Sequence, residues 1–303
     1  MATFTESQLK AYFQRVYFSQ DRHPPQSLQF VTSLLRHQLT YAPFETLGLH
    51  YSTGRQISLD PEALFHKIVT RRRGGYCLEN NAFFGVVLRS LGFLAYGVAC
   101  RITAATTGAT DGSWRAMSHM ANIVFIDGKK YLVDVGFGAD GPSLPLPLDA
   151  EAILEGLPGQ CLRLERKTLP QHTDPEQKVW VYCIRLGDSS PWKDIYHFHE
   201  QEFFALDFDV LNHYNMTIGR FTKLVVAQRF LCSTAGPETG LIGTILLSQD
   251  RIEQRNGTMP AEVLENFDAE AQRIAALEKH FQLALTAEEQ DAIRGTASEL
   301  RQK

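Results

Sequence analysis

The chain has 303 residues, of which 44% are hydrophobic and 21% charged, a composition that is typical of globular proteins and excludes a disordered one. This length supports a sizeable core divided into two or three packed subdomains. The net charge of −4 and the pI near 6.2 lack the basic excess of nucleic-acid-binding proteins, so we expect no nucleic-acid partner.

The N-terminal segment and the cysteines indicate the cellular compartment in which we expect the protein. The N-terminus has no basic stretch followed by an apolar core, so we expect no signal peptide. The longest apolar runs, such as residues 239–247, fall far short of the roughly 20 residues that cross a bilayer, so we expect no membrane span. The five cysteines form no CxxC pair and suit neither zinc nor a disulfide framework. We therefore expect a reduced, cytoplasmic protein without a metal.

The first ninety or so residues are predicted to be helical. Thr5 and Gln8 form a capping-box pattern ahead of apolar residues at helical spacing. Asp60 followed by Pro61 marks a second helix start, because aspartate caps helices and proline suits the first helical position.

A third helix is predicted from Tyr76 to Leu91. Gly74 and Gly75 allow a sharp entry into it, which places Cys77 in its first turn. A helix N-terminus offers free N–H groups and partial positive charge, which favour a thiolate and can accept an oxyanion. The alternative is that Cys77 is simply a buried structural cysteine, the interpretation we keep for the other four.

From Ala95 the apolar pattern changes to a period of two. Strands are predicted at residues 95–104, 119–126, 130–137, 161–166, 179–186 and 221–231. From Pro260 onward the pattern becomes helical again, most clearly over residues 261–281. The order is therefore helical, then β-rich, then mixed.

A hairpin in the β-rich part brings two titratable residues together. Asp127-Gly128 between two apolar runs is a strong signal for a two-residue hairpin. In that register His119 and Asp134 lie on one face, on a diagonal of about 7–8 Å. A buried Asp134 needs a partner. Paired with His119, Asp134 would orient this histidine as the base for a reactive cysteine. The alternative is that Asp134 faces solvent on a half-exposed sheet.

Two further segments carry weaker signals. Glu45 lies among apolar residues directly after a proline, as expected either for a loop that caps a pocket or for ordinary packing between helices. Residues 103–114 are rich in glycine and threonine, but they lack the P-loop pattern of a phosphate cradle.

Four motifs resemble arylamine N-acetyltransferases in order and spacing. They are PFETL, RRGGYCLENN, SHMANIVFIDGKKYLVDVGFG and DFDVLNHY, and the resemblance runs from about residue 10 to residue 235. It implies an α+β fold with a cysteine-protease-like core, in which an N-terminal helical bundle and a central β-barrel-like domain are completed by a C-terminal α/β lid. We place the boundaries at 1–94, 95–215 and 216–303.

The resemblance also implies a catalytic triad of Cys77, His119 and Asp134. The implied reaction is a ping-pong transfer of an acyl group, most often acetyl, from acyl-coenzyme A to an arylamine or arylhydrazine through an acyl-cysteine. Coenzyme A is thus a substrate, and no metal is implied. Phe44 and Phe137 are implied to line the aromatic pocket.

Donor contacts follow from the same motifs. Ser118, Gly138 and Tyr214 are implied to lie near the coenzyme A pantetheine or nucleotide. Mammalian members have Trp and Gln where this chain has Tyr76 and Glu79, and the segment after Tyr214 is shorter here. Because that segment shapes the coenzyme A cleft, a malonyl or propionyl donor stays open as an alternative to acetyl.

Two other functions stay open on the residues alone. A cysteine peptidase or amidase would use the same Cys-His-Asp order. A binding module would keep the three residues for structure only.

Overall fold

The N-terminal part of the chain is helical, as predicted. The computed structural model describes residues 2–300. Thr5 accepts a hydrogen bond from the Gln8 backbone and Asp60 accepts one from Ala63, so both predicted helix starts are confirmed. The helices of this part are α1 (Glu6–Arg15), α2 (Leu28–Tyr41), α3 (Pro61–Phe65), which continues into a π-helical turn (His66–Thr70), and α4 (Cys77–Ser90).

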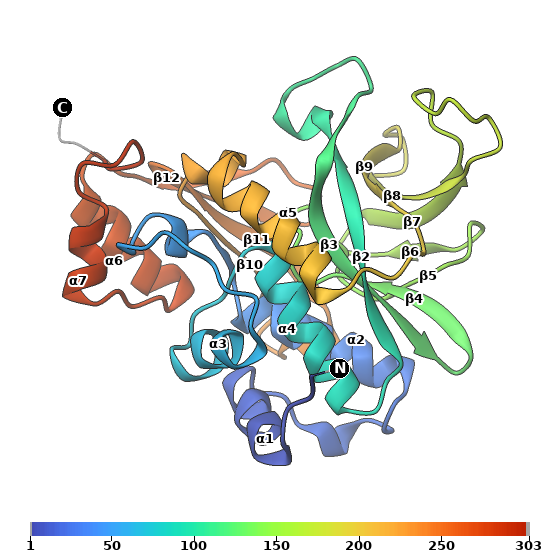
Figure 1. The fold of residues 1–303 in the computed structure, drawn as a ribbon, viewed down its shortest axis with the longest axis horizontal. Coiled ribbons are helices and arrows are strands. Elements are labelled where there is room, and N and C mark those ends of the chain that lie inside the picture. Colours follow the sequence, from blue (N-terminus) through green and yellow to red (C-terminus); the bar gives the residue numbers. More distant parts are fainter. Residues whose placement is uncertain (1, 301–303) are drawn as a thin grey trace.

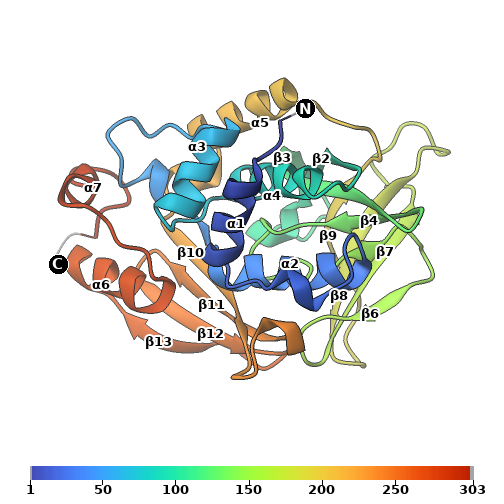
Figure 2. The ribbon, with the colours of Figure 1, turned by 90° about the horizontal axis from the view of Figure 1, so that it is seen from below.

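Helix α4 is the central helix of the fold. It matches the predicted helix within one residue at each end, and it ends before Gly92, whose φ of +85° a glycine adopts without strain. Eleven of its fourteen residues are buried, as expected for a helix covered on all sides. Figure 2 shows α4 between α2 and α5 (Ala205–Thr217).

An eight-stranded antiparallel sheet follows and curls into a barrel-like layer (Figure 1). Its spatial order is β5-β4-β3-β2-β9-β8-β7-β6. Apolar side chains from alternate positions of these strands fill its interior. The strands are β2 (Ala95–Thr103), β3 (Trp114–Ile126), β4 (Lys129–Val133), β5 (Leu146–Pro147), β6 (Ile153–Glu155), β7 (Gln160–Lys167), β8 (Val179–Leu186) and β9 (Lys193–Phe198).

A second, five-stranded sheet combines one strand from the N-terminal helical part with four strands from the C-terminal part of the chain. Its order is β1-β10-β11-β12-β13, so the short strand β1 from the helical part pairs with β10 from the C-terminal part. Helices α6 and α7 lie beside this sheet (Figure 1). The elements are β1 (Phe44–Glu45), β10 (Val226–Cys232), β11 (Leu241–Ser248), β12 (Arg251–Asn256), β13 (Glu262–Asn266), α6 (Glu270–Phe281) and α7 (Ala287–Ala292).

Short 3-10 turns connect these elements. They are Gln20–Arg22, Leu47–Leu49, Ala104–Thr107, Arg220–Thr222 and Pro237–Thr239. The glycine- and threonine-rich loop at 103–114 contains one of them and is mostly exposed.

Four predicted elements differ from the structure. The strand predicted at 119–126 begins earlier, at Trp114. The predicted helical stretch from residue 261 begins as strand β13, because pairing with β12 outweighs its local helical pattern. The strand predicted at 130–137 ends at Val133, where the chain turns toward α4. The strand predicted at 221–231 begins only at Val226. The strands that were not predicted from the sequence are β1, β5, β6, β9, β11, β12 and β13.

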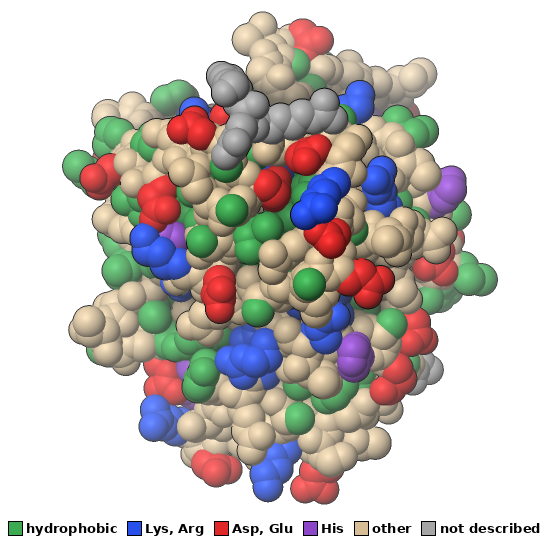
Figure 3. All heavy atoms as spheres, turned by 90° about the vertical axis from the view of Figure 1, so that its left-hand side faces the viewer, with side chains coloured by type: hydrophobic (Ala, Val, Ile, Leu, Met, Phe, Trp, Pro, Cys, Tyr) green, Lys and Arg blue, Asp and Glu red, His purple; other side chains and the backbone are tan. Residues whose placement is uncertain are grey.

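The face formed by the C-terminal helices carries mixed charges. In Figure 3 acidic and basic side chains alternate with apolar ones on this face, and neither sign dominates. Over the described residues, every helix is too short or too polar to cross a membrane.

Candidate active site

The Gly-Gly segment places Cys77 at the first residue of α4. A Cβ on Gly74 would lie 1.7 Å from the Pro43 carbonyl oxygen, so only glycine fits there. The Gly75 N–H donates to the same carbonyl at 3.3 Å. Cys77 is 5% exposed, and its Sγ lies 3.5 Å from the Ser118 carbonyl oxygen. The thiol therefore lies between the free N–H groups of a helix and the neighbouring strand β3.

The predicted hairpin brings His119 and Asp134 into contact. Ile126 pairs with Lys129 across the Asp127-Gly128 turn, as predicted. His119 Nε2 lies 2.7 Å from Asp134 Oδ2, and both side chains are almost completely buried. The alternative that Asp134 faces solvent is therefore wrong.

Charge distribution at this pair favours an imidazolium. Burial opposes charge on the ring, but the Asp134 carboxylate, with further contributions from Cys77, raises the pKa of His119 to about 10. Burial likewise opposes charge on Asp134, yet His119, Asn81 and the Gly136 N–H hold the pKa of this carboxyl below its usual value. His119 directly follows Ser118, whose carbonyl oxygen lies 3.5 Å from Cys77 Sγ, so the three predicted triad residues lie in one region of the structure. Their catalytic role stays a prediction.

Asn81 anchors this group and was not predicted from the sequence. Its Nδ2 donates to Asp134 Oδ1 at 2.8 Å and to the Met120 carbonyl at 2.6 Å, while its Oδ1 accepts from the Val135 N–H at 3.0 Å. The available signal was its spacing, because a residue four positions after Cys77 lies on the same face of a helix. Asn81 thus ties α4 to both sides of the hairpin.

Aromatic rings surround the histidine and the thiol. The Phe137 and Tyr196 rings each lie 5.1 Å from the His119 ring, and Phe137 meets it edge-on. Phe44 packs in the same apolar cluster as Cys77, and its ring lies 5.5 Å from that of Phe221. Phe44 therefore packs near the predicted nucleophile and Phe137 against the predicted base, and their contact with a substrate stays a prediction.

The three residues predicted to contact the donor have different surroundings. Ser118 is buried, and its carbonyl oxygen accepts from Asn215 Nδ2 at 2.8 Å besides contacting Cys77. Gly138 follows Phe137 with a φ of +105°. Tyr214 is half-buried on α5, one residue before Asn215. Their role in coenzyme A binding stays a prediction.

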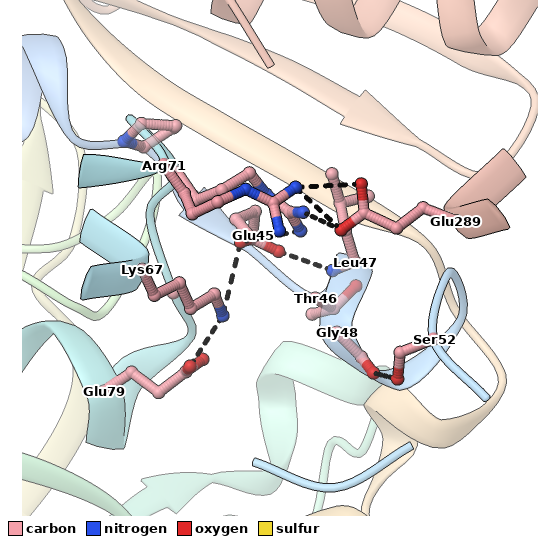
Figure 4. A network of polar contacts seen from close by, with 12 residues as sticks. Glu45, Thr46, Leu47, Gly48, Ser52, Lys67, Arg71, Glu79 and Glu289 are labelled. Atoms are coloured by element: carbon pink, nitrogen blue, oxygen red, sulfur yellow. Dashed lines mark hydrogen bonds and ion pairs between the residues drawn. The ribbon is translucent and has the colours of Figure 1, made fainter. Parts of the chain in front are cut away.

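A buried ionic network supports the start of α4 (Figure 4). Glu45 is completely buried, accepts from the Leu47 N–H at 2.6 Å, and pairs with Arg73 at 3.1 Å and Lys67 at 3.3 Å. Lys67 also pairs with Glu79 at 2.6 Å. Of the two interpretations that the sequence left open for Glu45, the structure favours packing, because this carboxylate binds neighbouring segments together.

One group in the described part of the chain has the residue types of a metal site. Glu165, Cys183 and Asp194 come together from β7, β8 and β9. Lys167 Nζ lies 2.9 Å from Asp194 and 3.4 Å from Glu165, and Arg163 Nη2 lies 2.8 Å from Glu165, so each carboxylate already pairs with a cation. We therefore assign no metal to this group.

Comparison with known proteins gives one consistent family. A family model described as N-acetyltransferase matches residues 27–290. An N-malonyltransferase from Gibberella moniliformis is 31% identical over 323 aligned positions, which cover 96% of this chain and 92% of the relative. An arylamine N-acetyltransferase from Mycobacterium bovis is 30% identical over 69% of each chain.

Solved structures agree in fold. The arylamine N-acetyltransferase of Nocardia farcinica is 27% identical with a TM-score of 0.78, covering 96% of this chain and 94% of its own. The Mycobacterium marinum enzyme in complex with CoA has a TM-score of 0.75 at 23% identity, covers 94% of this chain and 98% of its own, and supports the fold alone. This agreement confirms the expected α+β, cysteine-protease-like fold. The chain belongs to the arylamine N-acetyltransferase family and is an acyltransferase enzyme.

Proposed function

We propose that this enzyme transfers an acyl group from acyl-coenzyme A to the nitrogen of an arylamine or arylhydrazine through an acyl-enzyme at Cys77. The observation that carries the proposal is the position of the Cys77 thiol. It lies at the N-terminus of α4, 3.5 Å from the carbonyl oxygen of Ser118, and the next residue, His119, contacts a buried carboxylate. A thiol activated by an oriented base is the arrangement that nucleophilic catalysis needs.

The first half-reaction forms the acyl-enzyme. His119 holds the proton of Cys77, and the thiolate sulfur attacks the thioester carbonyl. The Cys77 N–H, free at the helix start, donates to the developing oxyanion. Coenzyme A leaves as a thiol after taking up a proton from His119, and the acyl group stays on sulfur.

The second half-reaction uses the same base. His119 accepts a proton from the attacking amine, and the acyl group passes from sulfur to nitrogen. Asp134 keeps the imidazole oriented and stabilises its charged form. The Phe44 and Phe137 rings supply aromatic surface for the ring of the acceptor. Membership of an acyltransferase family favours transfer to an amine over hydrolysis by the same residues.

The donor acyl group has two candidates. Acetyl is the donor that the resemblance implies, while the Gibberella relative is named an N-malonyltransferase and aligns with 96% of this chain.

Arg115 and Arg220 offer a reason to test malonyl-coenzyme A as the donor. Burial and repulsion by Arg115 lower the pKa of Arg220, and within residues 2–300 neither guanidinium pairs with a carboxylate.

These arginines flank the site. Arg115 lies on β3, three residues before Ser118, and Arg220 follows α5, whose Asn215 binds the Ser118 carbonyl. Such a pair of unpaired guanidiniums suits the free carboxylate of a malonyl group.

The state of the cysteines supports a reducing, cytoplasmic setting, because all five are free.

Intact-protein mass spectrometry tests the proposal. Wild type and Cys77→Ala are mixed with acetyl-, propionyl- or malonyl-coenzyme A in the absence of amine. We expect one acyl adduct on wild type alone, discharged by adding an arylamine. Absence of an adduct with every donor, on a folded protein, would refute the acyl-enzyme, and the adduct masses identify the preferred donor.

A further inference from the structure

The Ser118 carbonyl oxygen receives contacts from two different helices. The Cys77 thiol at the start of α4 lies 3.5 Å from this oxygen, and Asn215 Nδ2 on α5 donates to it at 2.8 Å. Both of these side chains are about 95% buried, since each is 5% exposed. One backbone oxygen therefore links the predicted nucleophile to α5.

A break in strand pairing makes this oxygen available to both side chains. His119 on β3 pairs with Cys100 on β2. Met117 pairs with Arg101, so the register skips Ser118, which lies between the two pairs. The skipped residue of such a β-bulge is left out of the ladder, and the bulge re-aims the side chains beside it. The buried Ser118 carbonyl therefore relies on donors from outside the sheet.

The same carbonyl is part of the backbone that carries the predicted base. It belongs to the peptide bond between Ser118 and His119, which is planar, so a hydrogen bond to its oxygen also restrains the backbone of His119. Helix α5 packs against β3 and brings Asn215 to this peptide (Figure 1). The Asn215 hydrogen bond thus restrains the backbone of the base and satisfies the acceptor beside the thiol.

This hydrogen bond has its largest effect when Cys77 loses its proton. A thiol can donate to the carbonyl oxygen, whereas a thiolate can only accept. If the thiol were the sole donor, loss of its proton would leave a buried carbonyl unsatisfied and facing a negative sulfur. We propose that Asn215 is a positioning residue that keeps the Ser118 carbonyl hydrogen-bonded while Cys77 is a thiolate, and so favours the reactive form. The inference rests on the proposed role of Cys77 as nucleophile.

Titratable groups from several elements also surround the thiol. They are His119 on β3 with Asp134 behind it, Cys100 on β2, and Tyr76 directly before α4. Helix α5 meets this region through uncharged amides, with Asn212 accepting from the Tyr76 hydroxyl. Substitution of Asn215 leaves every one of these titratable groups in place, so a difference from wild type reports the lost hydrogen bond.

The test is the pH dependence of Cys77 alkylation by iodoacetamide, followed on the Cys77 peptide by mass spectrometry. Asn215→Leu removes the donor, keeps a similar volume and leaves no room for a water to replace it. Below the midpoint of the profile we therefore expect labelling to slow by roughly tenfold. At high pH, where the thiol is deprotonated in both proteins, the two rates should converge. Asn215→Ala is the smaller change and should shift the profile in the same direction.

Asn212→Leu is the matched control. Asn212 lies on the same face of α5 three residues earlier, is 4% exposed, and donates to the Ile57 carbonyl at 2.8 Å. We expect it to lower stability in denaturant unfolding about as much as Asn215→Leu does, while it keeps the wild-type alkylation profile.

Two results would overturn the inference. One is a wild-type profile in the folded Asn215 variants, and the other is an equal shift in Asn212→Leu and Asn215→Leu. Alkylation requires no acyl donor, so a failure of this inference is separable from a failure of the proposed acyl transfer.

Discussion

Asn81 donates one hydrogen bond to Asp134 at 2.8 Å and another to the Met120 carbonyl at 2.6 Å. Helix α4 is thereby fixed to both strands of the hairpin that carries His119. These two hydrogen bonds hold the helix that carries the Cys77 thiol in a fixed position relative to the hairpin that carries the His119 imidazole. Because all of these groups are buried, a lost partner leaves polar atoms without a hydrogen bond.

Asn81→Ala should therefore weaken both the fold and the reaction. Each buried group left without its partner costs about 1–3 kcal/mol, so we expect the free energy of unfolding to fall by about 2–4 kcal/mol. A misplaced base lowers the transfer rate by roughly 10–100-fold. Denaturant unfolding and single-turnover kinetics measure the two effects. Asn256→Ala, at the exposed end of β12, is the control and should be nearly neutral.

Gly136→Ala should displace the thiol. A Cβ at this position would lie 2.9 Å from the Cys77 Cα and 2.8 Å from its carbonyl oxygen, so the backbone of α4 must move. We expect a loss of roughly 2 kcal/mol or more in stability together with slower acylation. Gly54→Ala has open space around its Cβ and an ordinary φ, so it should stay within about 0.5 kcal/mol of wild type. Equal stability of the two variants would contradict the close contact.

Iodoacetamide at pH 6 should label Cys77 in preference to the other cysteines. Burial raises the pKa of Cys183 to about 12, and it raises the pKa of Cys100 and Cys232 as well, so these thiols stay protonated. Cys77 is close to an imidazolium and a helix N-terminus, which favour its thiolate. Peptide mapping after brief labelling is the measurement. Comparable labelling of several cysteines would count against a Cys77–His119 ion pair.

Asp134→Asn should nearly abolish transfer while the protein stays folded. The amide has a similar shape, but it removes the charge that keeps the His119 imidazolium stable and correctly oriented. We expect a loss of about 10³–10⁴-fold in the acylation rate, by analogy with other triads. Retained turnover in a folded Asp134→Asn variant would remove this aspartate from the triad.

The His119–Asp134 pair should also make stability depend on pH. The folded pKa of His119, about 10, lies above its ordinary value of 6.5, so the stabilisation is complete below pH 6.5 and is lost as pH rises through 10. The pKa of Asp134 is lowered, so its contribution is lost as pH falls through that lowered value. The difference in unfolding free energy between wild type and His119→Gln, measured from pH 6 to pH 10, should therefore shrink. A constant difference would contradict the charged pair.

Several features were predictable because they depend on short-range interactions. The helix start at Asp60-Pro61 and the hairpin at Asp127-Gly128 follow from local backbone preferences. Once the hairpin register is known, strand alternation places His119 and Asp134 on one face. This pair of residues could therefore be predicted without knowledge of the fold.

Other features resisted prediction because distant segments determine them. Residues 262–266 have a helical pattern but pair with β12 as strand β13. Strand β1 forms because β10, about 180 residues later, supplies its partner. Asn81 was missed because its partners belong to another element, although its helical spacing from Cys77 was visible.

By itself, the sequence determined the helix that carries Cys77, the hairpin that pairs His119 with Asp134, and, through its motifs, the family. Only the tertiary structure decided that the thiol meets the Ser118 carbonyl, that Asn81 holds Asp134, and that Lys67 lies between Glu45 and Glu79. The physical reason is the range of the interactions. Turns, caps and strand alternation act over a few residues, whereas buried polar contacts form only after the packing of α4 against strands β2 and β3 and its other neighbours removes water from them.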